Sequence, residues 1–420
     1  MRILVLGSGA REHALAWRLG QDPAVQEVIA APGNPGWPER RPADLGHPAG
    51  LVDLARRERI DLTVVGPEMP LVAGVADAFR AAGLPVVGPT AAAARLESSK
   101  AFAKAFMQRH RIPTARFLVA ATADEALAIV REGKCGWPLV IKADGLAAGK
   151  GVVIALDPTD AESAVRDAMV ERRFGDAGGT VVFEECLTGP EVSVFALSDG
   201  QTVRLLLSAQ DHKRAFDGDR GPNTGGMGAF APSPLLTPDL AATVMASIVE
   251  PVIAGMRDEG HPYEGFLYAG LMLTADGPKV IEFNARFGDP EAQVVLPALD
   301  GPFAAVLQAA AEGRLADAPA LVWNERMYAG VVLASGGYPG DIETGFPIEG
   351  LAEAASAGAL VFHAGTAVRD NRLVTSGGRV LTVVGSGATY RDAIAHAYAA
   401  AGRIKFDKMH FRTDIGRSAL

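Results

Sequence analysis

The sequence predicts a multidomain α/β protein, and three observations support this fold class. Short apolar segments rich in β-formers alternate with helical segments through most of the chain. Strands separated by helices favour a parallel sheet with helices on its faces. The 420 residues suggest roughly two to four domains. A hydrophobic content of 49% supplies enough apolar side chains for several cores.

Residues 1–100 form the first expected domain, an α/β substrate domain. An apolar strand leads into the turn Gly7-Ser8-Gly9, and a helix follows that turn. The alternation then continues, with expected strands at residues 3–6, 27–31, 62–65 and 85–87 and expected helices at 11–19, 71–82 and 91–110.

Residues 101–320 form the second region, within which residues 120–190 have the size of a mobile lid lobe. The expected strands are residues 114–118, 139–142, 152–155, 181–185, two across 191–210, 265–273 and 279–283. The expected helices are residues 122–131, 161–169, 240–259 and 303–312, and residues 211–229 are expected to be a polar, glycine-rich loop.

Residues 321–420 form a small α+β C-terminal domain, which follows a linker at residues 316–324. Its expected strands are residues 329–333, 361–364 and 380–384. Thr389 and Asp392 resemble a helix capping box ahead of a helix at residues 393–401.

The charge balance and the cysteines exclude several classes of function. The 40 basic and 49 acidic residues give a net charge of −9 without a basic stripe, so we expect no nucleic-acid partner. Cys135 and Cys186 belong to no CxxC or Cys/His cluster, so neither a zinc site nor a disulfide framework is expected. No signal peptide is evident and no apolar run approaches the ~20 residues of a membrane helix. We therefore expect a cytoplasmic protein without a membrane partner.

The first chemical signal is residues 140–151 (VIKADGLAAGKG), a strand, a glycine-rich loop and the start of another strand. Glycines let backbone N–H groups approach an anion closely, and Lys142 and Lys150 add mobile positive charge. The segment is neither a Walker A loop nor a strand–GxGxxG–helix unit. It favours a loop that closes over phosphates, and the alternative is a glycine hairpin with two solvated lysines.

The second signal is residues 280–291 (VIEFNARFGDPE). Strand alternation puts Glu282 and Asn284 on one face, where their oxygens suit a hard cation such as Mg²⁺. Arg286 follows the strand and can pair with a carboxylate or phosphate. The alternative is an exposed polar strand edge that ends in a turn at residues 288–290.

Two further segments carry weaker signals. Residues 210–214 (QDHKR) and 221–228 (GPNTGGMG) are dense in charge, donors and glycine, as functional loops and solvated turns both are. The N-terminal GSGAREH departs from the dinucleotide fingerprint because Glu12 replaces its third glycine. The second strand also ends without the acid expected to hold a ribose, so NAD binding is not expected.

Taken together, the segments resemble the ATP-grasp superfamily, and closely its phosphoribosylamine–glycine ligase family. The matching segments, in chain order, are GSGAREHALAW, VVGPEMPLVAGVAD, GPTAAAARLESSKAF, IKADGLAAGKGVV, QDHKR, GPNTGGMGAF, GFLYAGLM, VIEFNARFGDPE, SGGYPGD and FHAGT. The family's first loop more often reads GNGGREH, whereas Ser8 and Ala10 stand here. The resemblance implies an ATP-grasp fold between a Rossmann-like mononucleotide-type domain and an α+β domain.

The resemblance also implies a reaction in purine biosynthesis. ATP, glycine and 5-phosphoribosylamine would give ADP, phosphate and glycinamide ribonucleotide through glycyl phosphate, with Mg²⁺ or Mn²⁺ as the metal. Phosphorylation turns a poor acyl donor into a good one, so the enzyme mostly positions groups and neutralises charge. A monomer is expected, with transient contact to the preceding or following enzyme of the pathway.

The resemblance further implies roles for individual residues. The expected ATP contacts are Lys104, Lys142, Gly145, Gly149, Lys150, Gly151, Glu184, Glu185, Leu187 and Glu191. The expected metal ligands are Glu282 and Asn284. Many ATP-grasp enzymes have another acid on the preceding strand, but residues 268–272 offer none, so ATP and water must supply more of the ligands. The expected catalytic residues are Arg286, Asp211 and Lys213, and the expected substrate contacts are Gly9, Pro67, Glu68, Asn223, Thr224, Asp289 and Glu291.

Three alternatives make different predictions. Another ATP-grasp ligase of purine metabolism would use a different acid or amine. A nicotinamide-dependent oxidoreductase would change NAD(P)H absorbance without forming ADP. A regulatory ATP-binding module would bind nucleotide without glycine-dependent turnover.

Overall fold

The N-terminal part is a four-stranded parallel sheet covered by helices, as the alternation predicts. The computed structural model describes residues 1–146 and 151–420. The strands are β1 (Arg2–Gly7), β2 (Glu27–Pro32), β3 (Leu62–Val65) and β4 (Val86–Val87), in the order β2-β1-β3-β4. The helices are α1 (Ala10–Gly20), α2 (Pro48–Arg57), α3 (Glu68–Val72) and α4 (Val75–Ala81). The helix expected at 71–82 is divided in two because Gly74 takes a left-handed conformation with φ 82°.

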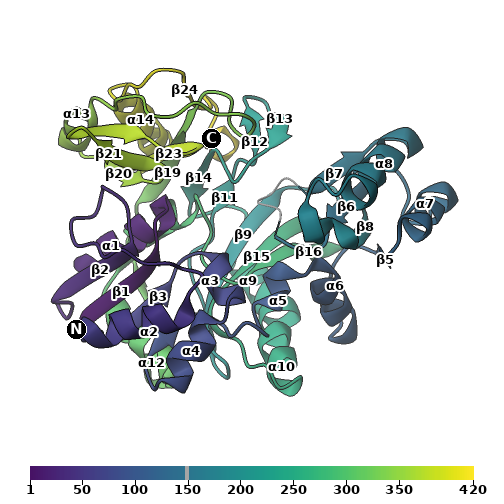
Figure 1. Ribbon diagram of the computed structural model, residues 1–420, viewed down its shortest axis with the longest axis horizontal. Coiled ribbons are helices and arrows are strands. Elements are labelled where there is room, and N and C mark those ends of the chain that lie inside the picture. The colour runs from purple at the N-terminus through teal and green to yellow at the C-terminus, as the bar shows by residue number, and fades with distance from the viewer. Residues whose placement is uncertain (147–150) are drawn as a thin grey trace.

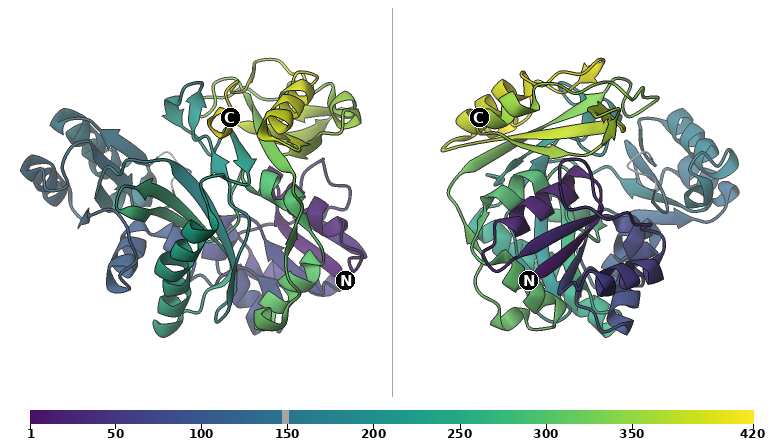
Figure 2. Two further views of the ribbon diagram at one scale, coloured as in Figure 1. Left: turned by 180° about the vertical axis from the view of Figure 1, so that it is seen from behind. Right: turned by 60° about the vertical axis from the view of Figure 1, so that its left-hand side comes forward.

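A separate lobe extends from the body of the molecule and contains most of residues 117–185 (Figure 1). Its antiparallel sheet has the order β5-β8-β6-β7. The elements are β5 (Phe117–Ala120), α7 (Ala123–Glu132), β6 (Leu139–Ala143), β7 (Val152–Ala155), α8 (Pro158–Val165) and β8 (Val181–Glu185). Figure 2 shows the lobe from behind, again projecting away from the other sheets. Helices α5 (Arg95–Ser98) and α6 (Lys100–Arg109) precede it, separated by the N-cap Ser99.

The large antiparallel sheet lies beside this lobe and has the order β10-β9-β15-β16. Its strands are β9 (Glu191–Asp199), β10 (Val203–Leu205), β15 (Glu264–Thr274) and β16 (Gly277–Asn284). The helical run Pro238–Asp258, which includes α9 (Pro238–Val244) and α10 (Glu250–Asp258), has a mean hydropathy of 1.4 and could cross a membrane by length and composition alone. Its buried Val244 and Ile248 pack in one core with Leu267 of β15, so it covers the sheet as a core helix.

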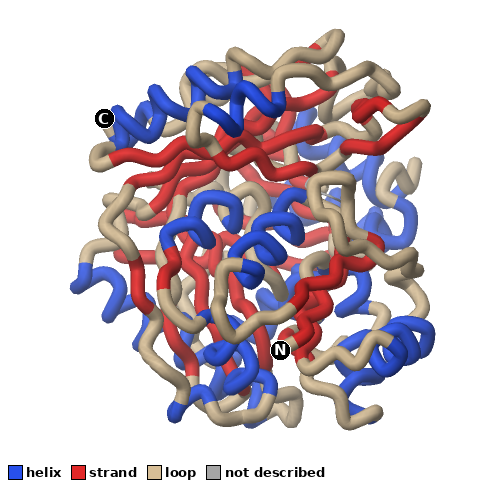
Figure 3. Tube along the Cα trace, turned by 90° about the vertical axis from the view of Figure 1, so that its left-hand side faces the viewer, coloured by secondary structure: helices blue, strands red, loops and turns tan. Residues whose placement is uncertain are grey.

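The C-terminal sheet has the order β11-β14-β19-β23-β20, with β24 also paired to β19. Its strands are β11 (Gln210–Asp211), β14 (Gly228–Ala231), β19 (Met327–Ser335), β20 (Leu360–His363), β23 (Arg379–Gly387) and β24 (Met409–His410). Helix α14 (Tyr390–Ala401) packs on β19 and β23, and Figure 3 shows helices on the outer side of this sheet.

The loop expected at residues 211–229 is therefore wrong in part. Short strands β12 (Arg214–Phe216) and β13 (Arg220–Asn223) form a hairpin within it, and β14 pairs with β19. One partner of β14 is the nearby β11, but the other, β19, lies about a hundred residues later in the chain, so local glycine content could not reveal this pairing.

Candidate active site

Two lysines and one glutamate form a buried ionic cluster where the lobe meets the large sheet. Lys104 Nζ on α6 lies 2.7 Å from Glu184 Oε2, and Lys142 Nζ on β6 lies 2.9 Å from Glu184 Oε1. Lys142 Nζ also donates to the carbonyl of Ile281 on β16, at 3.1 Å. Burial lowers the pKa of Lys104 to about 8, although Glu184 opposes this shift. One carboxylate thus holds two expected ATP lysines against the strand that carries Glu282.

The inner face of the lobe sheet combines this charge with apolar surface. Leu139, Ile141 and Phe183 pack against α7 and α8. Strand alternation therefore puts Val140 and Ile154, which are paired across β6 and β7, on the other face with Glu184. Ile154 is 44% exposed there. Such a face suits a flat, apolar base beside charged phosphates.

Residues after β8 connect this lobe to the large sheet. The carboxylate of Glu185 accepts from the backbone N–H of Arg116 at 3.0 Å and lies 2.7 Å from Arg116 Nε. Leu187 is half-buried in the segment that leads to Glu191 at the start of β9. Lys104 and Lys142 bind the side chain of Glu184. Leu187 and the backbone of this segment are therefore better placed to contact adenine than the Glu184 carboxylate is.

The base of the glycine loop is tied to the N-terminus of α6. Asp144 accepts hydrogen bonds from Ser99 Oγ at 3.2 Å and from the backbone N–H of Ala101 at 3.1 Å. Lys100 Nζ donates to the carbonyl of Gly145 at 2.8 Å. Gly145 has φ 135°, which favours glycine, and Gly151 begins the return to β7. The expected contacts Gly149 and Lys150 lie outside the described residues.

Lys213 lies between two carboxylates of the large sheet. Its Nζ is 3.1 Å from Glu191 Oε2 and 3.5 Å from Glu282 Oε1. Burial raises the pKa of Glu282, but Lys213, Lys142 and other cations outweigh it, and the net shift is downward. Tyr268 and nearby carboxylates raise the pKa of Lys213 despite its burial. Both groups of this pair are therefore charged at neutral pH.

Glu282 and Asn284 fit a hard divalent cation. Asn284 pairs with Tyr268 and Glu282 with Gly270 in the β15–β16 ladder, so the two share a face. The hydrogen-bond partners of Asn284 assign its amide nitrogen to the side of Glu97 Oε1, at 3.1 Å, and this orientation leaves the amide oxygen for a cation. Among residues 1–146 and 151–420 no group of three His, Cys, Asp or Glu side chains forms a complete cage. Substrate oxygens and water would therefore complete the shell.

Two further acids lie beside Lys213. Burial and Glu291 raise the pKa of Asp211 to about 8, against the opposing charge of Lys213. Burial also raises the pKa of Glu291, whose Oε1 accepts from Ser193 Oγ at 3.1 Å. Ser193 Oγ is 3.3 Å from the hydroxyl of Tyr268. Asp211 can therefore hold or release a proton close to neutral pH, and the pKa of Glu291 is shifted in the same direction.

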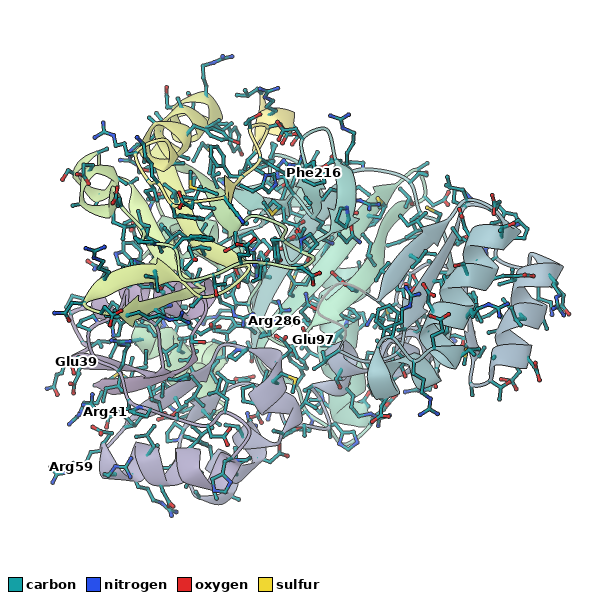
Figure 4. The ribbon with its side chains drawn as sticks, turned by 45° about the horizontal axis from the view of Figure 1, so that its top comes forward. Glu39, Arg41, Arg59, Glu97, Phe216 and Arg286 are labelled. Carbon is teal, nitrogen blue, oxygen red and sulfur yellow. The ribbon has the colours of Figure 1, made fainter. Side chains whose placement is uncertain are left out.

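Arg286 joins the large sheet to the N-terminal part. Its Nε lies 3.2 Å from Glu68 Oε2, and its Nη2 lies 2.9 Å from Glu97 Oε1. Figure 4 shows Arg286 and Glu97 together at the centre of the molecule. Although burial opposes its charge, Glu97 and Glu68 raise the pKa of Arg286. The ion pair with Arg286 thus connects Glu68 to the site residues of the large sheet.

The N-terminal turn meets the same cluster. Gly9 donates its backbone N–H to Glu12 Oε2 at 2.6 Å, so Glu12 occupies the N-terminus of α1 that a dinucleotide phosphate would need. A Cβ on Gly9 would lie 3.7 Å from Asp289 Oδ2, and Pro67 begins α3 after the adjacent strand. Gly9, Pro67 and Asp289 therefore lie near one another, and the dinucleotide alternative loses its phosphate position.

Asn223 is the last residue of the β12–β13 hairpin, and Thr224 follows it. Thr224 donates both its backbone N–H and its hydroxyl to the carbonyl of Lys213, at 2.8 and 2.9 Å. Asn223 pairs with Arg214 in the hairpin. The structure thus brings Asn223 and Thr224 close to Lys213.

Several residues of this cluster were missing from the sequence expectations. Glu97 and Glu12 bind expected site residues, and Tyr338 and Arg379 contact the same loops from the C-terminal sheet. Glu97 precedes Ser98-Ser99-Lys100, a polar run that could have signalled it. Tyr338 lies in SGGYPGD, one of the segments that resemble the family, and that match could have signalled it. Arg379 begins β23 after two glycines, and nothing local distinguishes it.

The lobe, the large sheet and the acidic strand β16 together define an ATP-grasp enzyme. Three family profiles match the chain: phosphoribosylglycinamide synthetase N domain at residues 1–97, ATP-grasp (A) domain at 98–292 and C domain at 328–418. The chain belongs to the phosphoribosylglycinamide synthetase family.

Relatives and solved structures agree with this assignment. A phosphoribosylamine–glycine ligase of Allochromatium vinosum is 51% identical over 100% of this chain and 99% of its own length. One of Escherichia coli K12 is 50% identical over the same shares. The crystal structure of a phosphoribosylamine–glycine ligase from Thermotoga maritima has a TM-score of 0.84 at 34% identity and covers 99% of this chain and 100% of that one.

A more distant structure supports the fold alone. The biotin carboxylase domain of the Hydrogenobacter thermophilus 2-oxoglutarate carboxylase, in complex with MgADP, has a TM-score of 0.72 at 17% identity. It covers 98% of this chain, and this chain covers 91% of it.

Proposed function

We infer that this chain ligates glycine to 5-phosphoribosylamine, with ATP converted to ADP and phosphate and with glycinamide ribonucleotide as the product. Full-length relatives at about half identity, named for this reaction, support the inference. The carrying observation in the structure is the hydrogen bond from Lys142 to Ile281, because it joins a lysine of the lobe to the strand of Glu282 and Asn284. Phosphate-binding and cation-binding groups thereby face one space.

The proposed sequence of events uses two displacements. A glycine carboxylate oxygen attacks the γ-phosphorus of ATP and releases ADP, and the amine of phosphoribosylamine then attacks the glycyl carbon and releases phosphate. No protein nucleophile is required. The chain's contribution is to hold the phosphates with Lys104 and Lys142 and to balance charge with Lys213 and Arg286.

The carboxyl groups of Asp211 and Glu291 suit the proton that the attacking amine must lose. A pKa raised to about 8 allows Asp211 to accept this proton near neutral pH, and the pKa of Glu291 is raised as well. A bound Mg²⁺ or Mn²⁺ at Glu282 and Asn284 would offset phosphate charge, and which of the two metals serves is open to experiment. Glu191 is half-exposed at the start of β9 and suits the ribose hydroxyls of ATP.

Other parts of the proposal concern the molecule in the cell. Gly9, Pro67, Glu68 and Asp289 would contact phosphoribosylamine, and Asn223 and Thr224 would contact glycine. We propose a cytoplasmic monomer that makes transient contacts with neighbouring enzymes of the pathway. Native mass spectrometry would test the oligomeric state.

The decisive experiment measures ADP release with single substrates omitted. Full rate should require both glycine and phosphoribosylamine, and replacing glycine with alanine or serine should reduce it. Equal ADP release with either substrate omitted would contradict the ligase assignment. A change in NAD(P)H absorbance would favour the oxidoreductase alternative instead.

A further inference from the structure

The C-terminal domain binds both polar groups of the Gly225 backbone. The hydroxyl of Tyr338 accepts a hydrogen bond from the Gly225 N–H at 3.0 Å. Arg379 Nη1, at the start of β23, donates to the Gly225 carbonyl at 2.6 Å. Gly225 lies in the loop of Asn223 and Thr224, so two residues more than a hundred positions away determine where this loop stands.

Arg379 also binds the turn after β16. Its Nη1 donates to the Asp289 carbonyl at 2.7 Å, and its Nη2 lies 3.0 Å from Asp289 Oδ2. Gln293 Nε2 donates to Asp289 Oδ1 at 2.7 Å. Burial opposes ionisation of Asp289, but Arg379 and Arg11 outweigh it and lower its pKa. One guanidinium therefore connects the two substrate loops.

The packing between the Gly225 loop and its neighbours is close. A Cβ on Gly225 would lie 3.1 Å from Arg379 Cζ. Gly226 has φ 110°, and a Cβ there would lie 2.3 Å from Pro290 Cδ. The backbone of one loop thus lies directly against the other loop. The planar guanidinium of Arg379 binds both loops because its several donors have a fixed geometry.

Both loops continue into the residues proposed for chemistry. Thr224 binds the carbonyl of Lys213, and Glu291 stands two residues after Asp289. A shift of the Gly225 loop would therefore move Lys213, and a shift of the Asp289 turn would move Glu291. Lys104 and Lys142, in contrast, are held by Glu184 with no contact to Arg379 or Tyr338 among the interactions of the described residues.

We propose that Arg379 and Tyr338 are positioning residues through which the C-terminal domain aligns the glycine and phosphoribosylamine subsites. The proposal rests on the ligase function inferred above. Displacement of reacting groups by about 1 Å can cost ~100-fold in rate. Loss of Arg379 therefore acts on the two small substrates, while the ATP subsite of the lobe is unaffected.

The test compares steady-state kinetics of Arg379→Met, Arg379→Lys and Tyr338→Phe with those of the wild type. Arg379→Met should lower kcat/KM for glycine and phosphoribosylamine by about 100-fold and leave KM for ATP within about twofold. Arg379→Lys keeps the positive charge but lacks the planar set of donors, so its kcat/KM should lie between those of Arg379→Met and the wild type. Tyr338→Phe removes one hydrogen bond and should cost about tenfold.

The matched control is Arg326→Met. Arg326 is an exposed arginine of the same domain, and its side chain binds Ser386 Oγ within that domain. It should show wild-type kinetics. A double variant of Tyr338→Phe and Arg379→Lys should lose less than the product of the two single effects, because both residues fix Gly225.

The outcomes separate the positioning role from the function on which it rests. Absence of glycine-dependent ADP release in the wild type would reject the ligase function itself. With an active wild type, unchanged glycine kinetics in Tyr338→Phe and Arg379→Lys would overturn the positioning role. An equal rise of KM for ATP and for glycine would also overturn it, since that pattern marks general destabilisation.

Discussion

Lys213 Nζ lies 3.5 Å from Oε1 of Glu282, the first of the two expected metal ligands. The residues come from different sheets: Glu282 is in β16, and Lys213 follows β11 of the C-terminal sheet. The lysine keeps its proton and the glutamate its negative charge. A divalent cation that binds Glu282 must therefore compete with the ammonium group of Lys213.

Glu282→Gln should abolish binding of the divalent cation at this position. The amide keeps the size of the side chain but removes the negative charge that a hard cation requires. We expect turnover at limiting Mg²⁺ to fall by ~100-fold or more, which corresponds to about 2.7 kcal/mol of transition-state stabilisation. Glu250→Gln, an exposed carboxylate on α10, is the control. Near-normal kinetics of Glu282→Gln across a Mg²⁺ titration would remove Glu282 from the site.

Glu184→Gln should destabilise the lobe and weaken ATP binding together. The change leaves Lys104 and Lys142 buried beside each other without their shared counter-charge. Removing one partner of a buried ion pair costs about 3–5 kcal/mol. We expect a lower Tm and at least a tenfold rise in KM for ATP, by thermal denaturation and steady-state assay.

The control for Glu184→Gln is Glu132→Gln in the same lobe. Glu132 pairs with Lys134 on the surface, where both side chains are more than half exposed. Exposed pairs contribute about 0–1 kcal/mol, so its Tm should stay near that of the wild type. Equal loss of stability in both variants would show that the Glu184 cluster has no special role.

Local pattern predicts several strands with the bounds that the structure shows. The strands expected at residues 62–65, 152–155 and 181–185 have the same bounds in the structure, because each is a β-rich apolar run with polar or glycine-rich flanks. Alternation also places Glu282 and Asn284 on one face, as the strand pairing confirms. Motifs whose residues are continuous in the chain can thus be located from local pattern alone.

Features that depend on pairing between distant segments could not be predicted from the sequence. Residues 211–229 were expected to be loop, yet β14 is a central strand because β19 pairs with it. Arg379 and Gly225 are 154 residues apart, and their contact depends on that pairing. Likewise, the ion pair between Lys104 and Glu184 depends on the packing of α6 under the lobe, and sequence periodicity does not encode that packing.

Asp211→Asn should stabilise the chain increasingly as pH rises. Burial and Glu291 raise the Asp211 pKa from its ordinary value of 3.8 to about 8. The folded state therefore binds this proton more tightly than the unfolded state, and the wild type loses stability as pH rises from about 4 through about 8. The Tm difference, variant minus wild type, should grow by ~2 °C between pH 5 and pH 8.5. Thermal denaturation with Asp276→Asn as an exposed control measures it, and a flat difference would show that Asp211 ionises normally.

Asp144→Ala should raise KM for ATP by releasing the base of the glycine loop. Asp144 receives hydrogen bonds from Ser99 Oγ and from the Ala101 N–H in the first turn of α6, so it adds a negative charge at a helix N-terminus. Loss of such an acceptor costs about 0.5–2 kcal/mol. The neighbouring Gly145 would still accept the hydrogen bond from Lys100 Nζ. We expect a rise in KM for ATP of about threefold to tenfold with KM for glycine unchanged, since the proposed glycine contacts lie in the loop that Tyr338 and Arg379 bind. Asp144→Asn keeps an acceptor oxygen and should lie between the wild type and Asp144→Ala. An unchanged KM for ATP in Asp144→Ala would show that the loop base is held by other contacts.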